Sequence, residues 1–194
     1  RSGSAFYELN PDDGKIISSV PVDGNPMGKI MDLDDGKFLV STAIGQVGLN
    51  KDTDAGWLYG IDMHHTKPIR WVTKLATMGL PEGQLSKDKK TAFFALKNGD
   101  MIAVDTHDGH ILWTKNFGTE FKTDVTLFED GAKTLVIGHT TDGIVHVVDA
   151  DNGHEIQKMN VGTGSYSAPL YADGMLYITT PHSIYAYHVG VSEK

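Results

Sequence analysis

The sequence predicts an all-β protein, a β-propeller built from four-stranded antiparallel blades. Two kinds of hairpin pattern alternate along the chain, and one of them recurs at intervals typical of propeller repeats. Glycine supplies 22 of the 194 residues, which favours many tight turns between short strands. No helical periodicity is sustained over three turns anywhere in the chain.

The first hairpin pattern is an apolar strand, a turn that begins with Asp or Asn and closes with Gly, and a second strand. A side chain of this type accepts a hydrogen bond from the backbone two residues on, and glycine takes the positive φ of the turn. The turns begin at anchor residues separated by 52, 43, 44 and 39 positions, and such periods indicate propeller blades. These anchors are Asn10, Asp62, Asp105, Asp149 and His188.

A second hairpin pattern lies between the copies of the first. In it, two apolar runs flank an Asp-Gly turn, which is a strong hairpin signal. Its copies cover residues 30–41, 125–137 and 167–179, and a more polar version covers 85–96. Each repeat therefore contains four strands, the number found in one propeller blade.

The first hairpin pattern resembles a known family. Residues 101–113, with Asp105, Gly109 and Trp113, resemble the repeat of quinoprotein-type (PQQ-like) propellers, roughly Ala-x-Asp-x-x-x-Gly-Lys-x-x-Trp. Residues 145–162 resemble the related YVTN-type repeat. The resemblance extends over nearly the whole chain, and its motifs specify the blade far better than they specify a function.

The resemblance also implies a role for the tryptophans. In that family the closing Trp docks between neighbouring blades, and we expect Trp113 to do so, as well as Trp71 after a one-residue insertion in its turn. Ser18 and Gln157 occupy the equivalent positions of the first and fourth copies, which is a departure from the enzymatic subgroup. Trp57 lies outside the motif.

Counting strands predicts seventeen, or about four blades, whereas single chains of the resembling family usually form rings of seven or eight. The chain is therefore expected to be about half of such a ring. An incomplete propeller exposes apolar faces and strand edges, so the missing blades are expected from another chain or from the rest of a longer precursor. We predict one partial propeller domain whose blades are 1–24 (outer half), 25–77, 78–120, 121–163 and 164–194 (inner three strands).

The charge balance restricts the partners. Seventeen Lys and Arg against twenty-five Asp and Glu give a formal net charge of −8, which argues against nucleic acid. No apolar run approaches the roughly 18 residues of a membrane helix, so no membrane span is expected. The chain has no cysteine, which excludes disulfides and thiolate zinc sites. A protein partner, or a second propeller half, is the expectation that remains.

One loop departs from the blade template. Residues 41–56 replace a connection that takes about four residues in the other repeats, and functional residues often lie on such loops. Asn50, Asp52 and Asp54 are spaced like the oxygen ligands of a calcium loop. The pattern is incomplete, because the glycine comes one place late and Ile61 stands where the bidentate Glu belongs. A solvated acidic loop is the alternative interpretation.

The nine histidines do not predict a metal site. No pair has a zinc-like spacing on one element, and several of the histidines lie at exposed turn positions. His188 replaces the Asp of the repeat turn. We therefore expect structural or solvated roles for the turn histidines His64, His65, His107, His110 and His154.

Two functions from different classes follow from the resemblance. The first is a non-enzymatic propeller that binds proteins or acts as a scaffold, as propellers in outer-membrane assembly do. The alternative is the propeller portion of a quinone-dependent dehydrogenase or a related redox enzyme, which would require PQQ and calcium. A sensory domain is a third possibility. The sequence assigns no catalytic or cofactor-binding residue. The resemblance and a first residue that is not Met lead us to expect an extracytoplasmic location, periplasmic or secreted.

Overall fold

The computed structural model describes residues 4–44, 55–77, 83–121, 123–130, 133–165 and 167–188. Within these ranges the chain forms seventeen strands and no helix, and every paired strand is antiparallel. The predicted all-β class and number of strands are confirmed for this part of the chain. Over the same ranges there is no helix with the length and apolar character needed to cross a membrane.

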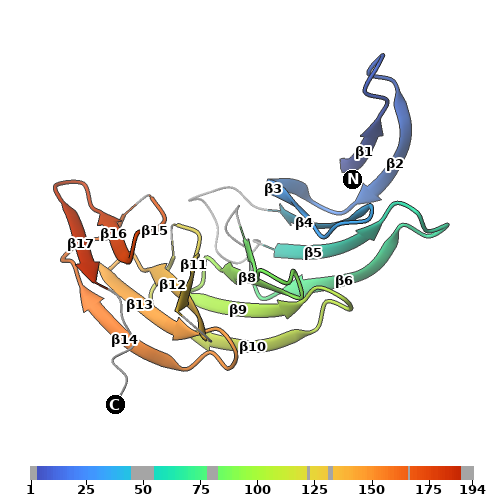
Figure 1. Ribbon diagram of the computed structural model, residues 1–194. Coiled ribbons are helices and arrows are strands. Elements are labelled where there is room, and N and C mark those ends of the chain that lie inside the picture. Colours follow the sequence, from blue (N-terminus) through green and yellow to red (C-terminus); the bar gives the residue numbers. More distant parts are fainter. Residues whose placement is uncertain are drawn as a thin grey trace. The chain divides into compact units, whose positions relative to one another are not determined.

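The chain divides into two compact units. The first unit comprises Arg1–Gly79 together with His107–Gly109. It contains a two-stranded hairpin and a four-stranded sheet in the order β3-β4-β5-β6 (Figure 1). The hairpin is β1 (Ser4–Leu9) and β2 (Ile16–Val22), and the sheet is β3 (Asn25–Asp32), β4 (Lys37–Ile44), β5 (Ala55–Asp62) and β6 (Ile69–Leu75).

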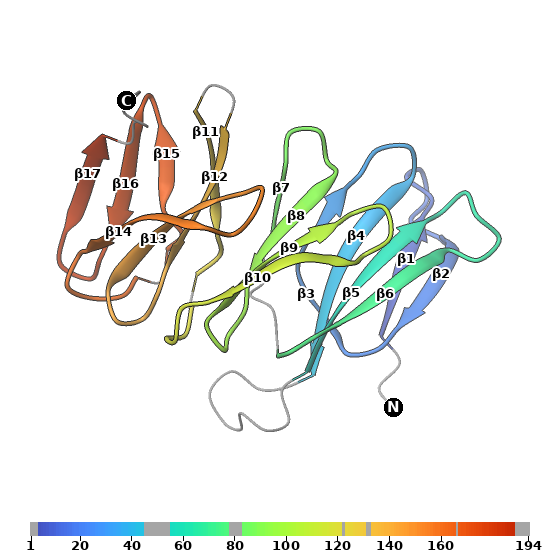
Figure 2. The ribbon, with the colours of Figure 1, turned by 90° about the horizontal axis from the view of Figure 1, so that it is seen from below.

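The second unit comprises Leu80–Thr106 and His110–Lys194. Its described strands form two four-stranded sheets and one three-stranded sheet, which stand side by side (Figure 2). The first sheet is β7 (Gln84–Leu85), β8 (Thr91–Ala95), β9 (Asp100–Asp105) and β10 (Ile111–Asn116). The second is β11 (Thr126–Asp130), β12 (Lys133–His139), β13 (Ile144–Asp149) and β14 (Glu155–Asn160), and the third is β15 (Leu170–Ala172), β16 (Met175–Thr179) and β17 (Ile184–His188).

The middle sheet of the second unit is apolar on both faces because a neighbouring sheet covers each face. Alternate residues of a strand point to opposite sides. Val136 and Val148 pack with Phe93 and other residues of the first sheet, whereas Ile137 packs on the other side with Leu176 of the third sheet. This two-sided burial explains the long apolar runs of the inner strands.

Strand pairing confirms the equivalence of the four positions that correspond to the closing Trp of the repeat. Each of these residues pairs with the residue two places before the Asp or Asn that opens its turn. The two tryptophans stand opposite small residues, whereas Ser and Gln stand opposite larger ones. The pairs are Ser18–Glu8, Trp71–Gly60, Trp113–Ala103 and Gln157–Val147.

Trp113 joins the first two sheets of the second unit. Its indole lies on Gly153 of the β13–β14 turn, where an added Cβ would come within 2.8 Å of the ring. Its Nε1 donates a hydrogen bond to the carbonyl oxygen of Ala150 in the same turn, at 2.8 Å. The Phe93 ring lies behind it, with 6.1 Å between ring centroids. Trp113 therefore packs between neighbouring sheets, as expected.

Trp71 makes the corresponding contact within the first unit. Its ring covers Gly60 of its own sheet and Gly109 of the β9–β10 turn, and a Cβ on either glycine would lie 2.2 Å from the ring. Thr73, two residues farther along β6, donates its hydroxyl to the Gly109 carbonyl. We call the packing of Trp71 on Gly109, and of Trp113 on Gly153, the Trp–Gly contact.

The long loop predicted for residues 41–56 is partly wrong. Strand β4 continues to Ile44 and β5 begins at Ala55, and these two residues pair. Ser41, Thr42 and Ala43 are buried, and the hydroxyls of Ser41 and Thr42 donate to the carbonyl oxygens of Met27 and Asp23, which holds this extension of the strand in place. Residues 45–54 lie outside the described residues.

The Trp–Gly contact predicts different costs for two glycine substitutions. Gly153 and Gly174 both have a positive φ, of 73° and 77°, but only Gly153 touches an indole. We expect Gly174→Ala to cost about 1 kcal/mol of unfolding free energy from backbone strain alone. Gly153→Ala is expected to cost roughly 1–3 kcal/mol more, because its methyl group overpacks the Trp113 ring. Urea denaturation of both variants measures the difference, and equal losses would contradict the contact.

Candidate functional site

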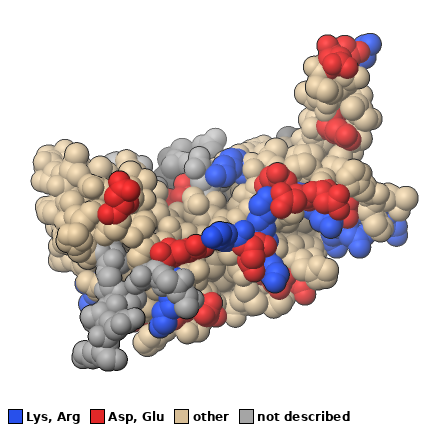
Figure 3. All heavy atoms as spheres, viewed as in Figure 1, with Lys and Arg blue, Asp and Glu red and all other residues tan. Residues whose placement is uncertain are grey.

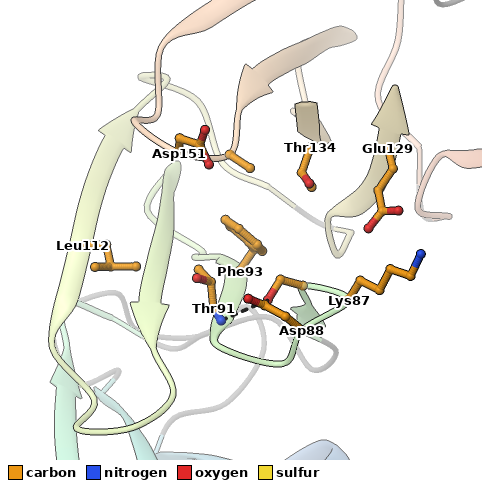
Figure 4. Close-up of a pocket in the computed structure, with 10 residues that line it drawn as sticks. Lys87, Asp88, Thr91, Phe93, Leu112, Glu129, Thr134 and Asp151 are labelled. Carbon is orange, nitrogen blue, oxygen red and sulfur yellow. Dashed lines mark hydrogen bonds between the residues drawn. The ribbon is translucent and has the colours of Figure 1, made fainter. Parts of the chain in front are cut away.

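A pocket of about 390 Å³ opens between the first two sheets of the second unit (Figure 4). Its floor is apolar and includes the buried ring of Phe93 and the half-exposed side chain of Leu112. Its rim is polar and comes from two turns and from strand ends. The rim residues are Ser86, Lys87, Asp88, Thr91, Glu129, Thr134 and Asp151, with Ala150 beside the floor. We call this cavity the Phe93 pocket.

The elements that hold the pocket follow from the fold. The β7–β8 turn supplies Lys87 and Asp88, β11 supplies Glu129, and the β13–β14 turn supplies Asp151. The backbone N–H of Asp151 donates to Oδ1 of Asp149 at 2.9 Å, so the repeat Asp shapes the wall of the pocket. The Trp–Gly contact holds the same turn through the Ala150 carbonyl.

Asp88 is held in place by its own turn. Its Oδ1 accepts hydrogen bonds from the Ser86 hydroxyl at 2.7 Å and from the Lys90 backbone N–H at 3.1 Å. The Ser86 hydrogen bond, followed by the Lys90 backbone, lowers the pKa of the Asp88 carboxyl below its usual value. The Ser86 hydroxyl in turn accepts from the Thr91 N–H at 3.0 Å. Asp88 is therefore an ionised part of the turn structure.

The other three charged rim residues have no ion-pair partner among the described residues. Lys87, Glu129 and Asp151 are exposed side chains of both signs around an apolar floor. Lys87 extends beneath Glu129 on one side of the pocket, whereas Asp151 stands on the other side, above Leu112 (Figure 4). Such an arrangement binds a ligand that has an apolar body and a charged end. The lining hydroxyl of Ser86 donates to Asp88 within the turn.

Three polar side chains in the sheet β11–β14 are linked in the order hydroxyl, imidazole and carboxylate. This is also the order of the groups in a Ser-His-Asp catalytic triad. Thr140 Oγ1 lies 3.1 Å from His146 Nε2, and His146 Nδ1 lies 2.7 Å from Glu155 Oε1. However, Thr140 is only 1% exposed, its hydroxyl also donates to Asp142 at 2.7 Å, and Phe117 covers His146 with 4.1 Å between ring centroids. The Thr140 hydroxyl is therefore buried and engaged within the sheet. The series satisfies buried polar atoms and stabilises the sheet.

Both the sequence and the fold of this chain are similar to those of known proteins. Residues 97–187 match the sequence model of the family described as outer membrane protein assembly factor BamB. The crystal structure of BamB from Moraxella catarrhalis superposes with a TM-score of 0.68 at 18% sequence identity, over 90% of this chain and 53% of that one.

Residues 97–187 carry PQQ-like β-propeller repeats. The resemblance expected from Asp105, Gly109 and Trp113 is thereby confirmed. The chain spans about half the length of BamB from M. catarrhalis. A computationally designed protein, Ika4, has a similar fold with a TM-score of 0.62 at 11% identity, over 87% of this chain and 94% of that one. No curated protein matches the sequence significantly.

The repeats explain several residues that the sequence singled out. Asn10, Asp62 and Asp149 each accept a backbone N–H two residues on through Oδ1, at 2.8, 3.0 and 2.9 Å, as expected for turn residues. The His64 ring lies against Gly36 of the β3–β4 turn, and His65 Nδ1 accepts from the Lys67 N–H at 3.1 Å. These two histidines therefore belong to turn structure, and the pocket includes neither of them.

The calcium candidates Asn50, Asp52 and Asp54 lie outside the described residues, so calcium binding stays a prediction. The charged residues of the Phe93 pocket were not predicted as a site. Asp88 lies in the more polar hairpin pattern of residues 85–96, and Glu129 precedes the Asp-Gly turn of another hairpin. The feature that these residues share in the sequence is their position in the repeats, because the turns of neighbouring repeats lie at the same edge of adjacent sheets.

His139 is the buried group that we expect to make the repeats sensitive to acid. Its side chain is 1% exposed, and among the described residues neither ring nitrogen has a well-aligned hydrogen-bond partner. Burial lowers the pKa of His139, and this effect outweighs the opposing influence of the nearby Thr163 backbone and the Asp142 carboxylate. His139 is therefore neutral in the folded protein near pH 7.

We expect the free energy of unfolding to fall as the pH drops below about 6.5, because unfolded His139 then takes up a proton that the folded protein resists. Above that pH both states are neutral and this effect vanishes. Urea denaturation at pH 7.5 and 5.5 measures the difference. His139→Phe should reduce it, whereas His154→Phe, the same change at an exposed turn, should leave it unchanged. An equal pH dependence in the two variants would refute the assignment.

Proposed function

We propose that this chain is a non-enzymatic propeller module that binds proteins or acts as a scaffold, and that further blades complete it. These blades come from another chain or from the rest of a longer precursor. The final sheet carries the proposal, since its described residues form three strands whereas the other sheets of the second unit have four. The similarity to a protein described as an outer membrane protein assembly factor supports the scaffold role. It also leads us to propose an extracytoplasmic location.

The open edge of β17 is the feature that favours completion. Among the described residues, β17 pairs only with β16, whereas the third strands β9 and β13 pair on both sides. Two apolar side chains of this sheet are largely exposed, Ile184 at 75% and Leu170 at 61%. An unpaired edge beside exposed apolar surface favours association with another strand.

The first hairpin of the chain is also an incomplete blade. The hairpin β1–β2 corresponds to the third and fourth strands of a blade, and among the described residues β1 pairs only with β2. Tyr7 and Leu9 of β1 are each about half exposed, at 52% and 53%. Among the described residues, β1 in the first unit and β17 in the second are therefore third strands of a blade that pair on one side only.

The solution mass of the chain tests this proposal. The isolated 21.1 kDa chain is expected to associate at micromolar concentration, because its exposed edges pair between molecules. Light scattering after size exclusion measures the mass. Ile184→Lys, which places a charge on the β17 surface, should shift the distribution toward monomer. Ile156→Lys on β14, where Ile156 is 45% exposed, is the matched control and should not. A soluble, monodisperse monomer of the unmodified chain would overturn completion by further blades.

A further inference from the structure

We propose that the Phe93 pocket binds the side chain of an arginine presented by a protein partner. This inference rests on the proposed protein-binding function and names the chemistry of its ligand. The pocket has an apolar floor, a volume of about 390 Å³ and charged groups at its rim. A flat cationic group on an aliphatic stem satisfies each of these features.

The charges of the pocket favour a cation. The four ionisable lining residues are Lys87, Asp88, Glu129 and Asp151, which together have a formal charge of −2. Lys87 lies on the side of Glu129, so Asp151 stands across the pocket from the one lining cation (Figure 4). The chain as a whole has a net charge of −8, and this attracts a basic partner from a distance. Figure 3 shows that acidic and basic side chains alternate on the visible face without one sign dominating, so the selectivity must come from the pocket.

The floor of the pocket favours arginine over lysine. Leu112 is 45% exposed, and Phe93, which is 2% exposed, closes the floor of the cavity. A guanidinium is planar and weakly hydrated, so it enters a pocket with an apolar floor at a lower desolvation cost than an ammonium. Its aliphatic stem covers apolar surface such as Leu112. The guanidinium also donates two parallel hydrogen bonds to one carboxylate, which suits Asp151.

The pocket is formed before any ligand binds. The Trp113 hydrogen bond to Ala150 and the Asp149 hydrogen bond to the Asp151 backbone hold one wall. The Ser86–Asp88 hydrogen bond holds the opposite wall. Binding to such a site orders few additional groups, so little conformational entropy is lost when a partner docks.

A titration with a minimal probe tests the inference. N-acetyl-arginine N-methylamide is added to the ¹⁵N-labelled protein, and amide chemical shifts are followed. We expect saturable shifts confined to the turn 86–91, to Leu112 and to Ala150 and Asp151. The citrulline analogue has nearly the same shape but no charge, and it should produce none. Equal shifts from citrulline, shifts elsewhere only, or no shifts with the arginine probe would overturn the inference.

Two variants that each remove one charge from the pocket are expected to change arginine binding in opposite directions. Asp151→Asn should weaken arginine binding about fivefold, the effect of losing one exposed ion pair. Lys87→Gln should tighten it, because it removes a repulsive charge. Asp173→Asn, which makes the same charge change at the β15–β16 turn of this unit, is the matched control and should leave binding unchanged. The wrong sign for Lys87→Gln, or an equal effect of Asp173→Asn, would also overturn the inference.

The solution mass tests completion by further blades, and the arginine titration tests the pocket, so the two proposals can fail separately. A chain that associates through β17 but does not bind the arginine probe retains the proposed function and loses the arginine pocket. A chain that binds the probe but remains a monomer loses completion by further blades and retains the pocket.

Discussion

The packing of an indole on a glycine of the following repeat turn is the contact on which the second unit depends. Trp113 approaches the β13–β14 turn closely because Gly153 has no side chain to intervene. The hydrogen bond from Nε1 to the Ala150 carbonyl then fixes the position of the turn. Because Ala150 and Asp151 line the Phe93 pocket, the same contact places one wall of the candidate site. A packing interaction thereby determines the geometry of a polar recognition surface.

The repeats differ in whether they make this contact, and both partners change together. Where the turn that follows has glycine, the preceding strand has tryptophan, as in the pairs Trp71–Gly109 and Trp113–Gly153. Strand β2 has Ser18 instead, whose hydroxyl donates to Glu8 at 2.8 Å. In the following β5–β6 turn, the carbonyl that closes the turn belongs to Pro68. Lys67 precedes it, in the position that glycine has in the other two turns. The first hairpin therefore attaches to its neighbour through Val20 and Val22, which pack with Tyr59 and Ile61.

Much of the fold could be predicted from the sequence because its determinants are local. The turn aspartates, the alternation of apolar residues and the equivalence of Ser18, Trp71, Trp113 and Gln157 all follow from short-range patterns, and the strand registers agree with them. The predicted loop after residue 41 was partly wrong, because strand pairing and the hydrogen bonds of Ser41 and Thr42 extend the strands beyond their apolar pattern. The pocket was not predicted, because its residues are as far apart as Ser86 and Asp151 and share no motif.

The sequence by itself determined the strands, the turns and the spacing of the repeats, because each depends on backbone preferences and side-chain alternation within about ten residues. Only the tertiary structure decided which side chains meet. It placed the Trp113 indole directly on the turn glycine Gly153. It buried His139 with no well-aligned partner among the described residues, and it brought Lys87, Glu129 and Asp151 around Phe93. These properties arise from contacts between neighbouring sheets, which no short stretch of sequence encodes.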